Sequence, residues 1–483
     1  MVSPLTHRVL FNSYFYLFLF LPVAFGGYFL LNRYLSHRTS RLFLLVASIA
    51  FYAWWNVVHL VRLIGLSLLF NFYIGKVLSG ELEAKFLQRF SRSSILFFGI
   101  ACNVASLVYF KYFDFFIENI NVLFGQSIPL LSIALPLGIS FFTFQEIAYL
   151  VDCYRGKTHG YSFVNYALFV TFFPQLIAGP IVHHGEIMPQ LDDPGRQRPY
   201  WQNIAAGLFM ISIGLAKKVI LADTFAVWAS EGFAHATQLS FAGGWVTSLS
   251  YTLQLYFDFS GYTDMALGSA LLFNITLPAN FNSPYQALNI QDFWRRWHMT
   301  LSRFLRDYLY LPLGGNRQGA FRTACNLFAV FVIGGIWHGA GWTYVLWGIL
   351  HGIASVVHYF FKASGRALPI GLSWLLTFLF VNFAWIFFRA ETVGDALAVS
   401  RSVVGGNGLG SSLAAFEMAV AGDAYLLFLW LSVGLGLVFF AKNSLWLLER
   451  FQSRKYELVF AVLLAILSLY SMNHYSEFIY FQF

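Results

Sequence analysis

His338 is the side chain of this sequence best suited to chemistry. It lies in the segment 334–342, which contains four glycines and has apolar residues on both sides. Glycines let a neighbouring backbone or a narrow substrate approach closely. An imidazole there can take a proton from a hydroxyl nucleophile and return it to a leaving group, because imidazole ordinarily titrates near neutrality. A histidine that only joins two helices by a hydrogen bond would give the same pattern, and this alternative stays open.

Other combinations of reactive residues are scarce. The sequence has no HExxH motif, and Cys102, Cys153 and Cys325 show neither metal-ligand spacing nor a pairing pattern, so no metal site is predicted. A Gly-x-Ser-x-Gly elbow and a phosphate-binding glycine loop are also missing, which argues against a serine hydrolase and an ATP-driven pump. Asp258 and Asp264 could form an acid pair, but pairing with nearby arginines or capping of a broken helix is the preferred interpretation.

Membrane helices must position these residues. The 483 residues are 58% hydrophobic and 11% charged, and apolar stretches long enough to span a bilayer follow one another along the chain. This composition predicts an all-α, polytopic transmembrane bundle of roughly ten to twelve helices, some of them re-entrant or interfacial. No linker or convincing internal repeat interrupts the pattern, which predicts one domain over residues 1–483 and weakens a transporter interpretation.

The net charge of +8 is explained first by topology, since Lys and Arg collect in cytoplasmic loops. The first apolar run, 14–31, has no convincing cleavage site and is interpreted as a retained helix. Further runs cover 42–57, 58–74, 95–109 and 130–151. Basic residues follow the first, third and fifth runs, which places these loops on one face and predicts an amino terminus outside the cell.

The segment 280–322 differs from the rest because it combines six arginines and two aspartates with many aromatic residues. A helix of about 15 residues, too short to span upright, is predicted over 290–305 with Asn289 as its N-cap. On such a helix Arg296 and Arg303 lie about 20° apart, and His298 points about 140° to 160° away from them. An interfacial helix whose arginines hold lipid headgroups explains the pattern equally well.

Five motifs of this part of the chain closely resemble the signature of the membrane-bound O-acyltransferase family. They occupy residues 280–285, 293–302, 305–310, 313–317 and 335–339. Residues 135–144, 173–180 and 256–264 look like the bacterial branch of that family that O-acetylates alginate or D-alanylates teichoic acid. The resemblance therefore covers most of the chain.

The resemblance implies a helical bundle around a central tunnel through the membrane, with a thioester donor entering from the cytoplasm. His338 is then the catalytic histidine and His298 a second, supporting one. No tightly bound cofactor is implied, and the donor is acetyl coenzyme A or an acylated carrier protein. Four arginines, Arg295, Arg296, Arg303 and Arg306, suit the donor phosphates. Topology alone explains the same arginines without a ligand.

The last six residues, 478–483, form an aromatic tail motif. It resembles the ending of a small partner peptide of teichoic acid alanylation, in which a tyrosine is proposed to receive the acyl group. By that analogy Tyr480 attacks the thioester with His338 as base. A tail that only anchors the chain at a membrane interface is the alternative.

These observations together predict transfer of an acetyl group across the bacterial inner membrane for O-acetylation of an exported polysaccharide such as alginate. A separate extracytoplasmic O-acetyltransferase is expected as a partner, and no nucleic acid. D-alanyl transfer to teichoic acid is the first alternative. A polysaccharide or lipid transporter without acyl chemistry is the second.

Overall fold

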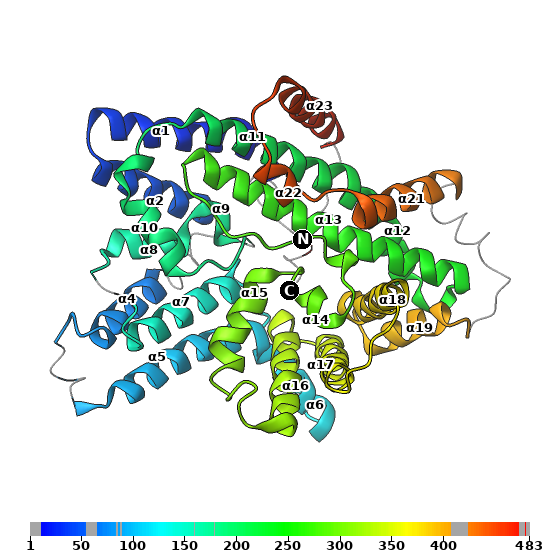
Figure 1. Cartoon of the computed structure of the whole chain (residues 1–483). Helices are drawn as coiled ribbons and strands as arrows, with labels where there is room; N and C mark the ends of the chain where they lie inside the picture. Colours follow the sequence, from blue (N-terminus) through cyan, green and yellow to red (C-terminus); the bar gives the residue numbers. More distant parts are fainter. Residues whose placement is uncertain are drawn as a thin grey trace. The chain divides into compact units, whose positions relative to one another are not determined.

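The computed structural model describes residues 11–54, 65–83, 86, 89–158, 160–177, 179–406, 424–472 and 479. Within these residues all regular structure is helical, and no strand occurs among them (Figure 1). The predicted all-α fold is therefore confirmed. Tyr480 and most of the tail 478–483, for which the sequence makes predictions, lie outside the described residues.

The α-helices follow one another along the whole described chain. They are α1 (Leu21–Tyr34), α2 (His37–Ala53), α4 (Leu66–Leu78), α5 (Arg92–Leu107), α6 (Phe113–Phe124), α7 (Ile139–Tyr154), α8 (Phe163–Thr171), α9 (Phe173–Leu176), α10 (His184–Asp192), α11 (Trp201–Ala216), α12 (Asp223–Ala234), α13 (Phe241–Leu272), α14 (Ile290–Trp294), α15 (Met299–Leu305), α16 (Gly319–His338), α17 (Trp342–Ala363), α18 (Ile370–Arg389), α19 (Val393–Val403), α21 (Ala424–Phe440), α22 (Ser444–Glu449) and α23 (Lys455–Ser471). Four π-helical segments, η2 (Tyr16–Phe20), η5 (Val108–Tyr112), η7 (Lys217–Ala222) and η10 (Arg306–Tyr310), continue or precede them.

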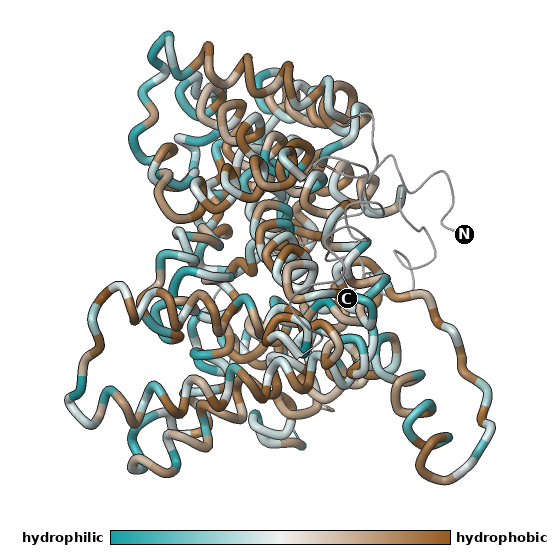
Figure 2. Tube along the Cα trace, turned by 90° about the vertical axis from the view of Figure 1, so that its right-hand side faces the viewer, coloured by the Kyte–Doolittle hydropathy of each residue, from teal (hydrophilic) through white to brown (hydrophobic). Residues whose placement is uncertain are grey.

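Six helical stretches among the described residues are long and apolar enough to cross a membrane. They are Tyr16–Tyr34, Arg92–Phe124, Trp201–Ala234, Gly319–His338, Trp342–Ala363 and Ile370–Arg389. Hydrophobic residues recur along the helices, with hydrophilic residues between them and in loops (Figure 2). The chain is a multi-pass helical membrane protein, although six spans are fewer than the ten to twelve helices expected from the sequence.

One predicted run begins too early. Residues 130–138 carry no helix, and α7 starts at Ile139 directly after Gly138, whose φ of 71° is left-handed. Two prolines, Pro129 and Pro136, explain the late start, because proline disfavours a helical conformation in the residue before it. Hydrophobicity alone did not reveal this boundary.

The chain divides into two compact units. The first contains Met1–Ser212, Tyr262–Pro278 and Gln452–Val462, and the second contains Ile213–Gly261, Ala279–Phe451 and Leu463–Phe483. The single domain expected from the sequence remains a prediction. Both histidines of the predicted site, 298 and 338, belong to the second unit.

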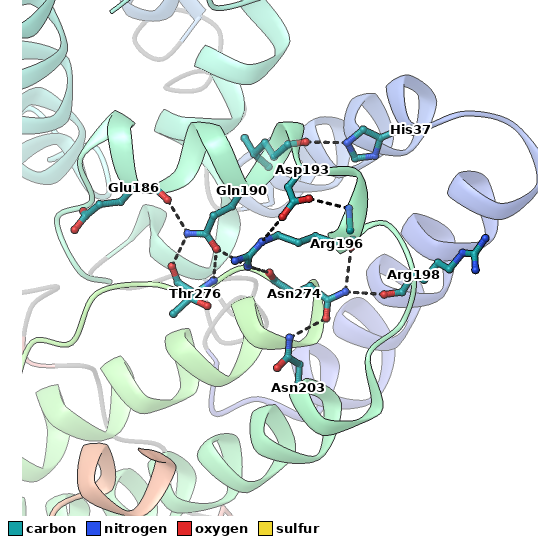
Figure 3. A network of polar contacts seen from close by, with 11 residues as sticks. His37, Glu186, Gln190, Asp193, Arg196, Arg198, Asn203, Asn274 and Thr276 are labelled. Atoms are coloured by element: carbon teal, nitrogen blue, oxygen red, sulfur yellow. Dashed lines mark hydrogen bonds and ion pairs between the residues drawn. The ribbon is translucent and has the colours of Figure 1, made fainter. Parts of the chain in front are cut away.

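Within the first unit, a polar network ties the loop after α10 to the loop after α13 (Figure 3). Arg196 donates to Oε1 of Gln190 at 2.8 Å and to the carbonyl of Asn274. Gln190 also exchanges hydrogen bonds with the main chain of Thr276, and Asn274 donates to the carbonyl of Arg198 at 2.7 Å. These bonds satisfy main-chain groups that neither loop can satisfy by itself.

Within the second unit, α16 and α17 form an antiparallel hairpin joined by residues 339–341, and α18 packs against α17 (Figure 1). The short helix α14 also packs against α17. This arrangement brings the motif 293–302 and the motif 335–339 onto neighbouring elements.

Candidate active site

His338 is the last residue of α16, at the turn into α17, and only 4% of it is exposed. Its ring lies edge-on against the rings of Trp347 and Phe388, with 5.1 Å between centroids in both cases. Trp337 makes a similar contact at 4.9 Å. The imidazole is therefore held among aromatic rings inside the second unit and does not face lipid.

Two glycines let the main chains of α16 and α17 touch next to this histidine. A Cβ atom on Gly335 would lie 2.5 Å from the carbonyl oxygen of Tyr344 and 2.9 Å from the Cα of Gly348. A Cβ on Gly348 would lie 2.6 Å from the carbonyl oxygen of Phe331. The expectation that glycines here serve close backbone approach is confirmed, and the partner is a helix of the same hairpin.

His298 lies between two short helices and not within one long helix. The predicted helix 290–305 is wrong: α14 ends at Trp294, α15 begins at Met299, and His298 itself has a left-handed backbone with φ 44°. The predicted N-cap is correct, because Asn289 accepts from the amide of Asp292. The predicted angles between Arg296, Arg303 and His298 do not apply to a broken helix.

Tertiary hydrogen bonds explain the break. The amide of Met299 donates to the carbonyl of Asn280 at 3.0 Å, and the amide of Asn282 donates to the carbonyl of Arg296 at 2.9 Å. The side chain of Asn280 accepts from the hydroxyl of Thr300 at 2.6 Å. Main-chain groups that would continue the helix are thus used by the segment 280–282, and a left-handed residue turns the chain.

The ring of His298 is fully buried. Its Nδ1 lies 3.4 Å from Oδ1 of Asn280, and its ring meets that of Phe259 edge-on at 4.8 Å. Burial lowers the pKa of His298 to about 3, because a charged imidazole would lose its hydration there. His298, which lies outside the six candidate spans, is therefore neutral at physiological pH.

Aromatic contacts join the two histidines into one cluster. Trp297, the neighbour of His298 in the chain, contacts Trp385 at 4.9 Å, and Trp385 contacts Phe388 at 5.3 Å. Phe388 in turn contacts His338 at 5.1 Å. The structure therefore brings the two predicted histidines onto the same cluster, linked by a short series of ring contacts.

His351 belongs to this cluster too, a proximity that sequence reasoning missed. Nδ1 of His351 accepts a hydrogen bond from Nε1 of Trp294 at 3.2 Å. Its ring also contacts Trp347, the ring that packs on His338, at 4.7 Å. The spacing of 13 residues between His338 and His351 gave no sign of this, because they lie on different helices.

The four arginines expected to hold the donor have different surroundings. Arg296 pairs with Asp292 at 2.9 Å, and Arg306 pairs with its neighbour Asp307 at 2.7 Å. Arg295 is exposed and Arg303 is half-buried. Two of the four charges are therefore balanced by carboxylates of the same segment.

The structure also shows what surrounds Asp258, a carboxylate of the aromatic segment 256–264. Asp258 lies within the unbroken helix α13 and pairs with Lys218 at 2.7 Å. Both parts of the earlier interpretation, an arginine partner and a broken helix, are therefore wrong for Asp258. A lysine partner was hard to foresee, because Lys218 lies 40 residues earlier in the sequence and on a different helical segment.

The described residues contain no cluster of three or more His, Cys, Asp or Glu that could hold a metal ion. All three cysteines are free, and Cys325 is exposed.

Comparison with known proteins identifies the family to which this chain belongs. A family model for the membrane-bound O-acyltransferase family matches residues 131–390, a range that includes His298 and His338. A peptidoglycan O-acetyltransferase of Helicobacter pylori is 49% identical over 431 residues, which cover 83% of this chain and 81% of that protein. A probable alginate O-acetylase of Pseudomonas aeruginosa is 40% identical over 392 residues, which cover 80% of this chain and 73% of that protein.

A more distant relative is a teichoic acid D-alanyltransferase of Bacillus subtilis. It is 28% identical over 273 residues, which cover 53% of this chain and 69% of that protein. The chain belongs to the membrane-bound O-acyltransferase family, and the resemblance found in the motifs is confirmed. It is an enzyme, an acyltransferase.

Proposed function

We propose that this enzyme moves an acetyl group from a thioester on the cytoplasmic side of the bacterial inner membrane to an exported polysaccharide. The observation that carries the proposal is the position of His338, a buried imidazole at the α16–α17 turn among the rings of Trp347 and Phe388. A histidine that is kept from lipid within a membrane helix of an acyltransferase is a strong candidate for the general base.

Peptidoglycan is the favoured acceptor. The chain shares 49% identity with a peptidoglycan O-acetyltransferase and 40% with a probable alginate O-acetylase. The difference favours peptidoglycan over the alginate expected from the sequence. A separate extracytoplasmic transferase would complete the reaction by moving the acetyl group onto a sugar hydroxyl.

His338 and Tyr480 carry the proposed chemistry. His338 takes the proton of the Tyr480 hydroxyl while the tyrosine oxygen attacks the carbonyl carbon of the thioester. The C–S bond of the thioester then breaks. The departing thiolate takes the proton from the imidazolium, which leaves a free thiol and an acetyl ester on tyrosine. Neutral His298, held by Asn280, would support the site from the other side of the aromatic cluster. A tunnel through the bundle would connect the donor with this centre.

Donor choice separates this function from D-alanyl transfer. The purified enzyme in lipid nanodiscs should release thiol from acetyl coenzyme A, and mass spectrometry should find one acetyl group on Tyr480. Tyr480→Phe should abolish both. An enzyme that ignored acetyl coenzyme A but accepted a D-alanyl carrier protein would instead support teichoic acid alanylation.

A transporter without acyl chemistry predicts a different phenotype. Deletion of the gene would then stop polymer export, while any polymer that still escaped would keep its normal acyl content. The proposed function predicts the reverse, namely normal export of a polymer that lacks O-acetyl groups.

A further inference from the structure

Lys218 and Asp258 form a buried ion pair in the second unit. Nζ of Lys218 lies 2.7 Å from Oδ1 of Asp258 and 2.8 Å from Oδ1 of Asp223. Only 3% of Lys218 and 1% of Asp258 are exposed. Charged groups inside a membrane protein are costly to bury, and those that occur usually serve a function.

A close approach of two helices makes this pair possible. A Cβ atom on Gly261 of α13 would lie 2.7 Å from the carbonyl oxygen of Gly214 and 3.1 Å from the amide nitrogen of Lys218. Asp258 lies three residues before Gly261, on the same side of α13. Lys218 lies within the π-helical segment η7, and Asp223, five residues later, directly follows it; residues at that spacing lie close together in a π-helix.

The second carboxylate oxygen of Asp258, Oδ2, accepts a hydrogen bond from the main chain of Ile479. The amide of Ile479 donates to Oδ2 of Asp258 at 3.0 Å, across a separation of 221 residues. Ile479 is itself buried. Each oxygen of this carboxylate therefore has a partner, one a lysine side chain and the other a main-chain amide, and such charge-assisted bonds are among the stronger ones.

This contact lies beside the candidate active site. Phe259, the next residue of α13, packs edge-on against the ring of His298 at 4.8 Å. Tyr480 directly follows Ile479 in the sequence.

We propose that Lys218 and Asp258 are positioning residues that anchor the chain at Ile479 through its main-chain amide. Lys218 contacts one carboxylate oxygen of Asp258, and the other oxygen accepts the hydrogen bond from the amide. The role of Tyr480 rests on the proposed function, but the anchor itself does not. Because the contact uses the main chain, it depends on an N–H group at position 479 and not on the isoleucine side chain.

Hydrogen exchange of the Ile479 amide tests the anchor without any acyl donor. In the full chain in nanodiscs, Asp258→Asn should speed this exchange by about tenfold or more, because a neutral amide oxygen is a weaker acceptor. Glu146→Gln is the matched control, since Glu146 is also a buried carboxylate but binds Ser67 of the first unit. An unchanged rate in a folded Asp258→Asn protein would overturn the proposal. If that variant fails to fold, Lys218→Gln/Asp258→Asn replaces it and removes both charges together.

A second experiment links the anchor to acyl transfer. Ile479→Pro removes the amide hydrogen, whereas Ile479→Val keeps it and changes little else. Acetylation of Tyr480 should fall at least tenfold in the proline variant and stay near normal in the valine variant. Equal acetylation in both variants would refute a positioning role. Accelerated exchange in Asp258→Asn without any tyrosine ester in the wild type would instead leave the anchor intact and defeat the proposed function.

Discussion

The ring of His298 meets the ring of Phe259 edge-on, at 85° and 4.8 Å between centroids, within a fully buried site. Its pKa is lowered by burial to about 3 from 6.5. Between pH 3 and pH 6.5, His298 therefore binds a proton in the unfolded chain but not in the folded chain. The free energy of unfolding should therefore rise with pH in this window by about 1.4 kcal/mol per pH unit, and fall as pH drops below 6.5.

Thermal unfolding at a series of pH values measures this dependence. The apparent Tm of the wild type should fall on acidification from neutral pH to about pH 5, and it should fall less steeply in His298→Gln, which has no group to titrate. Parallel curves for the two proteins would contradict a neutral, buried histidine at this position.

His338→Gln should lower acetyl transfer by about a hundredfold to ten-thousandfold, the range expected when a positioned base is lost. Folding should be preserved, since glutamine keeps polar atoms in a similar place. The matched control is His358→Gln on α17, which carries the same substitution at a half-buried position. Thiol release from acetyl coenzyme A measures both variants, and near-normal release from His338→Gln would exclude the base.

Gly335→Ala should destabilise the protein by about 1 to 3 kcal/mol, because the new methyl group overlaps the carbonyl oxygen of Tyr344 and the backbone has to move. Activity should fall as well, since His338 follows three residues later. Gly436→Ala on α21 is the control, because a Cβ there would meet nothing within 4 Å. Apparent Tm values of the two variants should differ clearly; the same Tm would contradict the close packing.

The arginines make a prediction about donor affinity. Arg295→Gln should raise KM for acetyl coenzyme A more than Arg296→Gln or Arg306→Gln, because the last two arginines already pair with Asp292 and Asp307. Steady-state kinetics at low salt measures the difference. A uniform effect of the three substitutions, or none, would argue that topology alone explains these charges.

Much of the fold and the site could be predicted from local sequence. Apolar length gave the helices, and Asn289 gave the start of α14 correctly, because capping depends on residues only a few positions apart. The left-handed turn at His298 could not be predicted in this way, since Asn280 creates it from 18 residues away. The partner of Asp258 was missed for the same reason, and so was the place of His351 beside the ring of Trp347.

The contact between Gly335 and Gly348 also has a consequence for motion. Two helices whose main chains touch cannot slide past each other by exchanging side-chain rotamers, so α16 and α17 should move as one rigid body. His338, at the tip of this hairpin, then keeps its orientation through each catalytic cycle. Any gate that admits the donor or releases the product should therefore be sought in helices outside this pair.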